Sequence, residues 1–433
     1  MKKILSLILC VSIVAVMCMV SACTKKEAIN DNVESISENA EKVSKDEEKG
    51  KLSFYAWDEG QRGIMEAVID VFHKTYPNVE VELTIIPWDD YWLKMQTSLN
   101  TDNGPDVFWM NTTYTPDYIP AGMVENLTPY IEAENIDMSV FPQVFIDCYS
   151  YEGNLYGIPK DFDTIGLFYN KSLFDEAGVA YPTDDWTWDD MYEASKKLAS
   201  AGVMAIDMDL SNDQTYVANF IYTNDGGRCR SEDGTSLHMN TPAVKEAFEY
   251  MMKYVDEGLS PDYNAMQELG AHERFMGGLS AMTMSGSWNV RTYMEALGEE
   301  NLGVVEVPAN KVEACCINGL AISINANSKV KDLAWEFVKT FTTVEGGKAQ
   351  AQTVIPANKE ATSTWQENFG DFDVSCFMRS TETALPCLEA TKKTSEQYDT
   401  MLGYFQRIWS KELSIEEGLA QLDKDCEAIA ESK

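Results

Sequence analysis

The chain has 433 residues, of which 34 are Lys or Arg and 70 are Asp or Glu, so its formal net charge is −36 at pH 7. This acidity opposes binding to nucleic acids and to anionic membrane surfaces, because both are polyanions. The length exceeds that of one ordinary domain core and predicts two.

The amino terminus has the layout of a secretory signal peptide. Lys2 and Lys3 give a short basic start, residues 4–20 are almost wholly apolar, and small residues precede Cys23. This order resembles a bacterial lipoprotein signal, in which the cysteine becomes the acylated first residue of the mature protein. We therefore expect a signal peptide over residues 1–22 and lipid on Cys23. A transmembrane anchor is the alternative, since seventeen apolar positions reach the short end of the spanning range.

Residues 23–50 are expected to form a flexible, charged tether. Charges of both signs alternate there and large apolar side chains are almost absent, so the segment cannot bury enough surface to offset the entropy of ordering. An exposed charged helix is the alternative. Either would let a globular body stand away from the membrane.

The first part of the body alternates between strand and helix patterns. "KLSFYAW" at 51–57 and "VEVELTII" at 79–86 are predicted strands, and "PDVFWM" at 105–110 is a short apolar strand after a Gly-Pro break. Amphipathic helices are expected between them. This alternation predicts a parallel sheet covered by helices, whose ligands bind at the carboxyl ends of the strands.

The same alternation continues to the carboxyl terminus. "TIGLFYN" at 164–170 and "GLAISINA" at 319–326 are further predicted strands. Helices are expected within 184–202, within 241–259 and from about Thr391 onward, the second of them opened by Pro and closed by Gly.

No motif of metal, nucleotide or nucleophilic chemistry was found. Cysteines after Cys23 number seven, show no C-x-x-C spacing and are expected to be buried thiols with at most one bridge. "DMDLSND" at 207–213 resembles a calcium loop but lacks its central Gly and its final Glu. We expect no metal and no cofactor. A carboxylate pair for glycoside hydrolysis stays open, since it needs only two acidic residues suitably separated in space.

Aromatic residues near predicted strand ends and turns favour a sugar ligand. Sugar rings present C–H faces and a rim of hydroxyls, which match flat aromatic rings and Asp, Asn or Gln side chains. These aromatic residues are Trp57, Trp88, Trp109, Tyr216 and Trp288. For each of them, packing in a protein core is the alternative.

Several motifs in one order resemble the extracellular solute-binding protein family of ABC-type sugar importers. They are "GPDVFWMN", "YEGNLYGIPKDFDTIGLFYNKSLFDEAG", "WTWDDMYEASKKL", "GGLSAMTMSGSWNV" and "NGLAISINANSKVKDLAWEFVKTF". The resemblance spans essentially all of residues 51–433. It implies an α/β fold of two lobes joined by crossing hinge strands, with the ligand in the cleft between them. The amino-terminal lobe would hold 51–163 and 318–356, and the carboxyl-terminal lobe 164–317 and 357–433.

The resemblance also implies ligand-binding residues. Trp288 matches a tryptophan that stacks on sugar in the family, and we expect the turn at Gly286 to face it toward the cleft. Asp163 matches an acidic residue near the hinge. No basic residue follows Asp58, unlike in the family's maltose-binding member, so a malto-oligosaccharide is not implied. The full set is Trp57, Asp58, Asn111, Asp163, Tyr216, Trp288 and Tyr398.

The expected function is binding of a carbohydrate by a monomeric lipoprotein on the extracytoplasmic side of the cell membrane, with an ABC permease as partner. An exported glycoside hydrolase or lyase is one alternative. A binding protein for a polyamine, a peptide or a metal-complexed solute is another, mildly favoured by the acidity.

Overall fold

The computed structural model describes residues 45, 48–101, 103–225, 229–387 and 390–432. Cys23, the predicted signal peptide and almost all of the predicted tether lie outside the described residues. Within the described part of the chain, no helix combines the length and apolarity needed to cross a membrane.

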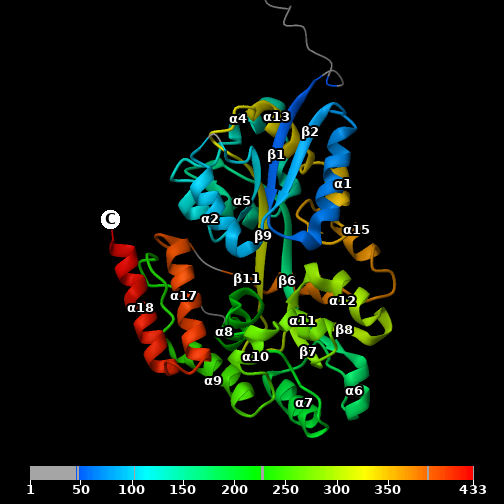
Figure 1. Cartoon of the computed structure of the whole chain (residues 1–433), viewed down its shortest axis with the longest axis vertical. Helices are drawn as coiled ribbons and strands as arrows, with labels where there is room; N and C mark the ends of the chain where they lie inside the picture. Colours follow the sequence, from blue (N-terminus) through cyan, green and yellow to red (C-terminus); the bar gives the residue numbers. More distant parts are fainter. Residues whose placement is uncertain (1–44, 46–47, 102, 226–228, 388–389, 433) are drawn as a thin grey trace, which may run out of the picture. The chain divides into compact units, whose positions relative to one another are not determined.

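A mixed sheet of nine strands organises the described residues (Figure 1). Its main path runs β10-β6-β9-β3-β1-β2, while β7 and β8 pair with β6 and β11 pairs with β9. A separate hairpin is formed by β4 and β5. The strands are β1 (Gly50–Ala56), β2 (Val79–Ile85), β3 (Val107–Asn111), β4 (Ser150–Tyr151), β5 (Asn154–Leu155), β6 (Ile158–Asn170), β7 (Met282–Gly286), β8 (Leu302–Glu306), β9 (Cys315–Ile324), β10 (Ile355–Pro356) and β11 (Ala384–Pro386).

Two long strands, β6 and β9, each belong to two parts of the structure. The first half of β6 pairs antiparallel with β9, and its second half, from Ile165 onward, pairs with β7 and β8. Similarly, β9 pairs with β11 at its start and with β3 at its end. In Figure 1 both strands run from the upper group of elements into the lower one.

The first lobe is built around β1, β2 and β3, which are parallel as predicted. Its core contains Phe54, Trp109 and Phe337. The helices α13 and α14 come from late in the sequence but pack against α1. The helical elements of this lobe are η2 (Glu59–Gln61), α1 (Arg62–His73), α2 (Trp88–Ser98), α3 (Thr115–Tyr118), α4 (Thr128–Glu134), η3 (Met138–Val140), α5 (Gln143–Cys148), α13 (Lys331–Thr340) and α14 (Val344–Gln350).

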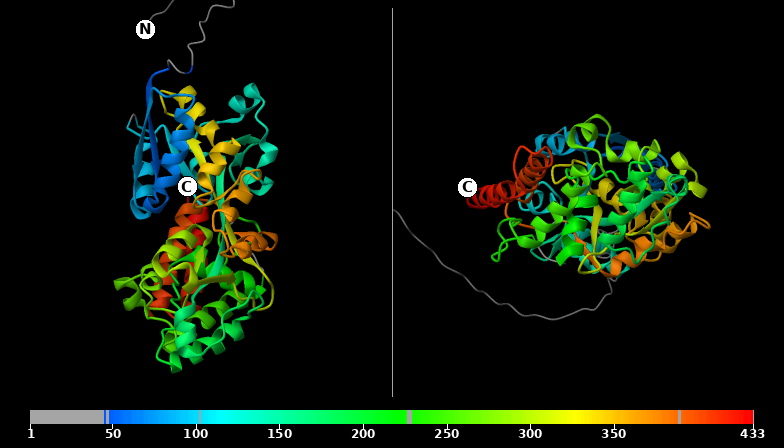
Figure 2. Two further views of the ribbon diagram at one scale, coloured as in Figure 1. Left: turned by 90° about the vertical axis from the view of Figure 1, so that its right-hand side faces the viewer. Right: turned by 90° about the horizontal axis from the view of Figure 1, so that it is seen from below.

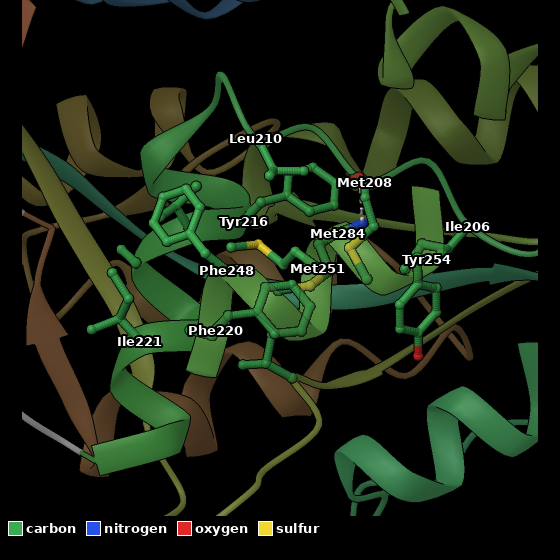
Figure 3. Close-up of a cluster of buried hydrophobic side chains, with 14 of the residues drawn as sticks. Ile206, Met208, Leu210, Tyr216, Phe220, Ile221, Phe248, Met251, Tyr254 and Met284 are labelled. Atoms are coloured by element: carbon green, nitrogen blue, oxygen red, sulfur yellow. Dashed lines mark hydrogen bonds between the residues drawn. The ribbon is translucent and has the colours of Figure 1, made fainter. Parts of the chain in front are cut away.

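The second lobe is built around a methionine-rich core. Met251 and Met284 pack there with Phe220 and Phe248 (Figure 3). The last two helices, α17 and α18, lie side by side, and α18 contacts α9 (Figure 2). The helical elements are α6 (Lys171–Ala177), α7 (Trp188–Ser200), η4 (Asp213–Val217), α8 (Ala218–Asp225), α9 (Pro242–Asp256), α10 (Tyr263–Glu268), α11 (Ala271–Met276), η5 (Ser287–Asn289), α12 (Val290–Leu297), η6 (Glu299–Asn301), α17 (Thr394–Trp409) and α18 (Ile415–Glu431).

A third, smaller core lies along β6 where the strand changes partners. It contains Phe168 of β6 together with Trp365 and Phe377. The elements that contribute to it include α15 (Thr362–Glu367) and α16 (Ser375–Arg379), followed by η7 (Ser380–Glu382). Apolar packing therefore continues past the point where β6 leaves one partner strand for the next.

Local sequence accounts for helix ends that the pattern predicted. The helix α9 begins at Pro242 after Thr241, whose hydroxyl accepts a hydrogen bond from the backbone N–H of Val244. It ends before Gly258, which has φ of +70°, a conformation that glycine adopts without a steric cost. The predicted α/β fold is confirmed.

Candidate functional site

A cleft of about 490 Å³ lies where β6 and β9 pass from one lobe to the other. Both strands contribute to its lining, as do η2 and β3 of the first lobe and η4, η5 and α17 of the second. The lining residues are Trp57, Asp58, Gln61, Trp88, Asn111, Asp161, Phe162, Asp163, Asp209, Ser211, Asn212, Asp213, Gln214, Ser287, Trp288, Asn318, Leu320, Val354, Tyr398, Leu402 and Gln406.

Six of the seven predicted ligand-binding residues lie in this cleft, although they are far apart in the sequence. The fold therefore brings together, in one cleft, residues that the resemblance implied separately. They are Trp57, Asp58, Asn111, Asp163, Trp288 and Tyr398.

Tyr216, the seventh, does not line the cleft. It is 2% exposed and packs in the core of the second lobe beside Leu210 and Met284 (Figure 3). Its hydroxyl lies 2.8 Å from the Thr283 hydroxyl and accepts a hydrogen bond from the backbone N–H of Met284. The structure therefore does not bring Tyr216 to the cleft with the other six residues. The π-helical turn η4 presents Asp213 and Gln214 there instead.

Gly286 supports Trp288 for a reason other than the expected turn. Gly286 ends β7 with extended backbone angles, so its conformation needs no glycine. A Cβ placed there would lie 1.8 Å from Cζ3 of Trp288. The indole ring therefore lies directly against the Gly286 backbone, and glycine is required for space rather than for a bend.

Aromatic rings support the first-lobe wall of the cleft. The Trp57 ring packs edge-to-face against the rings of Trp88 and Trp109, with centroid distances of 5.2 and 5.1 Å. Trp92 stacks on Tyr114 behind them at 3.6 Å. Packing on several sides holds the Trp57 ring in a fixed orientation at the cleft surface.

A buried ion pair lies at the base of the cleft on β6. The Lys160 ammonium donates to Oδ2 of Asp161 and lies 4.0 Å from the centroid of the Trp109 ring. Both residues are buried, with Lys160 1% and Asp161 3% exposed. Burial raises the pKa of Asp161, whereas the adjacent Lys160 charge lowers it. The other carboxylate oxygen of Asp161, Oδ1, has no hydrogen-bond partner.

A chain of hydrogen bonds connects the first lobe to Asp163. The Thr112 hydroxyl donates to Oδ1 of Asn318 at 2.7 Å, and Asn318 Nδ2 donates to Oε1 of Gln214 at 3.2 Å. Gln214 Nε2 then donates to Oδ1 of Asp163 at 2.6 Å. Burial raises the pKa of Asp163 well above its ordinary range and the neighbouring Asp161 raises it further, while the bond from Gln214 lowers it.

Two more carboxylates line the second-lobe wall. Burial raises the pKa of Asp213 to about 7, and the Cys387 thiol 3.8 Å from its Oδ2 acts in the opposite direction. Burial also raises the pKa of Asp209, which is lowered in turn by hydrogen bonds from Ser211. The site thus contains carboxyl groups that hold protons more tightly than exposed ones.

On the first-lobe side, Asp58 organises the turn before α1. Its two carboxylate oxygens accept hydrogen bonds from the Gly60 backbone N–H and from Nε2 of Gln61, each at 2.8 Å. The other polar atom of the Gln61 amide, Oε1, is buried without a partner. The hydroxyl of Ser287, on the opposite lobe, is also buried and unpartnered.

Sequence reasoning did not identify Gln61, Asp161, Asp213 or Gln214. Asp161 could have been found, because it precedes Asp163 by two residues on a strand and therefore shares its face. Asp213 and Gln214 belong to "SNDQ", whose orientation depends on the π-helical turn and leaves no periodic pattern. Within the described residues, no group of three or more His, Cys, Asp or Glu side chains is arranged to hold a metal ion.

The profile of the family described as bacterial extracellular solute-binding protein matches residues 67–369. The chain belongs to this family. A galactooligosaccharide-binding protein of Bacillus subtilis is 25% identical over 326 residues, covering 70% of this chain and 72% of that one. The diacetylchitobiose-binding protein DasA of Streptomyces coelicolor is 27% identical over 293 residues, covering 65% and 67% respectively.

A solved structure has a similar fold. The ABC substrate-binding protein Lmo0181 of Listeria monocytogenes, in complex with cycloalternan, superposes with a TM-score of 0.81 at 25% identity. The alignment covers 89% of this chain and all of the other. The predicted two-lobed binding-protein fold and the predicted solute-binding family are both confirmed.

Proposed function

We propose that this family member binds a carbohydrate in the cleft and delivers it to the permease of an ABC transporter, as a lipoprotein on the extracytoplasmic side of the cell membrane. The observation that carries the proposal is one cleft that contains aromatic rings together with carboxylate and amide side chains. Trp57, Trp88, Trp288 and Tyr398 supply the rings. Such rings pack on the C–H faces of sugars while the polar groups receive and donate hydroxyl hydrogen bonds.

The relatives support a saccharide as the solute. The names of the Bacillus and Streptomyces proteins specify a galactooligosaccharide and diacetylchitobiose, and the Listeria protein is in complex with cycloalternan. These ligands differ from one another, and the feature that they share is that each is a saccharide.

Binding is proposed to close the two lobes about β6 and β9. A ligand that contacts both lobes stabilises the closed arrangement, and the permease recognises that arrangement. Small-angle scattering with and without a bound saccharide tests this step. The radius of gyration should decrease on binding, and an unchanged value at saturation would contradict hinge closure.

A thermal-shift screen of mono- and oligosaccharides tests the binding proposal, because a ligand that binds only the folded protein raises its melting temperature. Calorimetry on Trp288→Ala then tests the site. Trp186→Ala is a matched control, since Trp186 is another partly buried tryptophan on the same core but lies outside the cleft. We expect Trp288→Ala to lose most of the affinity and Trp186→Ala to keep it.

Two results would contradict this function. If no saccharide in the screen shifts the melting temperature, the proposal that the ligand is a carbohydrate is contradicted. Release of shorter sugars from an oligosaccharide, detected by chromatography, would instead support an exported glycoside hydrolase or lyase.

A further inference from the structure

The described lining of the cleft contains several carboxyl groups and no cationic side chain. Five aspartates contribute, and none of the described lining residues is Lys, Arg or His. The five are Asp58, Asp161, Asp163, Asp209 and Asp213. Two cationic or titratable groups lie close behind the lining. Lys160 is buried and engaged by Asp161 and the Trp109 ring, and His272 is a neighbour whose pKa is lowered by burial. Lys160 thus compensates Asp161, whereas no described cation lines the cleft beside the other four carboxyl groups.

Three buried polar atoms of the lining point independently to a missing partner. Oδ1 of Asp161, Oε1 of Gln61 and Oγ of Ser287 are shielded from solvent and make no hydrogen bond. An unmade hydrogen bond to a buried group is costly, more so for a charged one. A carboxylate oxygen and an amide oxygen can only accept, so a partner for two of these atoms must be a hydrogen-bond donor.

We propose that the saccharide bound here carries a protonated amino group, whose ammonium is held by the unpartnered oxygen of Asp161 beside Asp163. This inference rests on the proposed function and names the class of sugar. An ammonium supplies three donors and a positive charge, whereas a hydroxyl supplies one donor and no charge. Charge-assisted hydrogen bonds are roughly twice as strong as neutral ones.

The protonation behaviour of the site agrees with this assignment. Burial holds the pKa of Asp163 well above its ordinary range, and the neighbouring Asp161 raises it further, although Lys160 acts in the opposite direction. Two carboxylates two residues apart on one strand face repel each other. A bound ammonium would relieve that repulsion, and a neutral sugar would leave it in place.

The aromatic walls are compatible with the same ligand. The faces of tryptophan and tyrosine rings attract cations as well as sugar C–H groups. Trp57 and Trp288 come from opposite lobes of the cleft. One ring system can therefore hold the sugar while the strand β6 holds its amine.

Pairs of sugars that differ only at the amine test the proposal. Calorimetry should compare the β-1,4 disaccharides of glucosamine, N-acetylglucosamine and glucose, together with the monosaccharide pairs glucosamine/glucose and galactosamine/galactose. We expect an amino sugar to bind about tenfold or more tightly than its hydroxyl counterpart. Its affinity should also fall as ionic strength rises. Equal or tighter binding of the neutral or N-acetylated member would overturn the amine while leaving the proposed carbohydrate function intact.

Spermidine separates the amine from the sugar. If it binds and no saccharide does, both this inference and the carbohydrate function fail in favour of a polyamine. If nothing in the set binds, both are overturned for these ligands.

The variant Asp163→Asn tests whether the preference for an amino sugar depends on the Asp163 carboxylate. Asn keeps an oxygen that can accept from Gln214 but removes the charge, whereas Asp161→Asn would leave Lys160 buried without its partner and could prevent folding. We expect Asp163→Asn to reduce the preference for the amino sugar over its hydroxyl counterpart severalfold. A merely structural role would weaken both sugars equally and leave that preference unchanged, which would contradict the assignment.

Discussion

Gln214 donates a 2.6 Å hydrogen bond to Asp163, joining the π-helical turn η4 to the crossing strand β6. The bond engages Oδ1 of Asp163 and orients the carboxylate. A carboxylate held by one oxygen is oriented for a ligand without losing its capacity to accept a second donor.

The first prediction concerns Asp163 itself. Asp163→Ala should lower ligand affinity by about 1.5–3 kcal/mol, the range for hydrogen bonds that involve a charged group. Calorimetry gives the affinity, and thermal unfolding confirms the fold. Asp256→Ala removes an equal charge from an exposed position on α9 and should leave the affinity unchanged. An equal loss in both variants would show a general charge effect.

The second prediction concerns Gly286. In Gly286→Ala the new Cβ would overlap the Trp288 ring, so the indole must move and ligand affinity should fall at least tenfold. Gly63→Ala is the control, since nothing lies within 4 Å of its Cβ position in α1 and alanine favours a helix by about 0.5–1 kcal/mol. Tryptophan fluorescence should change only in Gly286→Ala. Unaltered affinity in that variant would place Trp288 away from the ligand.

The third prediction concerns Asp117, which caps α17 from another element. Its carboxylate accepts from the backbone N–H groups of Thr394 and Ser395 at 3.2 and 2.8 Å, while Lys393 at the cap position supplies no side-chain bond. Asp117→Ala should lower the free energy of unfolding by about 0.5–2 kcal/mol.

Ligand affinity should fall as well in Asp117→Ala, because α17 carries Tyr398 into the cleft. Denaturant titration and calorimetry measure the two effects. Asp70→Ala, an exposed position on α1, should change neither. Wild-type stability of Asp117→Ala would show that α17 does not depend on this cap.

The fourth prediction is a pH dependence caused by Asp213. Its pKa is raised from 3.8 to about 7 by burial, so between these values the unfolded chain has lost a proton that the folded protein retains. Stability therefore decreases as pH rises through this window. Asp213→Asn removes the titration, and its stability relative to the wild type should increase from about pH 4 to pH 7 and then level off.

Denaturant unfolding of both proteins from pH 4 to pH 8 measures that difference. Asp137→Asn is the control and should give a flat difference over this range, because hydrogen bonds from Ser139 lower the pKa of Asp137 from 3.8 and its titration therefore lies below pH 4. A flat difference for Asp213→Asn would mean that Asp213 ionises normally.

The fifth prediction concerns the amino terminus and rests on sequence alone. Cys23→Ala should release the protein from membranes into the medium or periplasm, because the acylation site is lost. Mass spectrometry of the wild-type mature protein should find lipid on Cys23 as its first residue. A mature protein that begins elsewhere would contradict the lipoprotein assignment.

Sequence patterns predicted the parallel strands of the first lobe because hydrophobic alternation and Gly-Pro breaks are local properties. The strand at 319–326 was also expected, but its place between β3 and β6 was not, since pairing between distant strands leaves no trace in either one. Trp288 was found through its motif. The spatial reason for Gly286 required coordinates, because only they show the ring lying on the backbone.

Tyr216 shows where motif matching does not predict the position of a side chain. Matching by motif assigned it to the ligand, but one π-helical turn rotates the segment so that Gln214 faces the cleft and Tyr216 faces the core. A single extra residue in a turn changes which side chain is presented, and composition does not report it.

The position of β9 between β3 and β6 sets an order of assembly during synthesis. A chain that has emerged only as far as residue 314 contains β3 and β6 but not the strand that separates them in the sheet. The first lobe would then lack an interior strand and the helices α13 and α14. Cys315, where β9 begins, follows Asn111, where β3 ends, by about 200 residues, and closing so long a loop is entropically costly and slow. Chains truncated before Cys315 should accordingly be digested rapidly by protease, and resistance of their first lobe would show that it folds without β9.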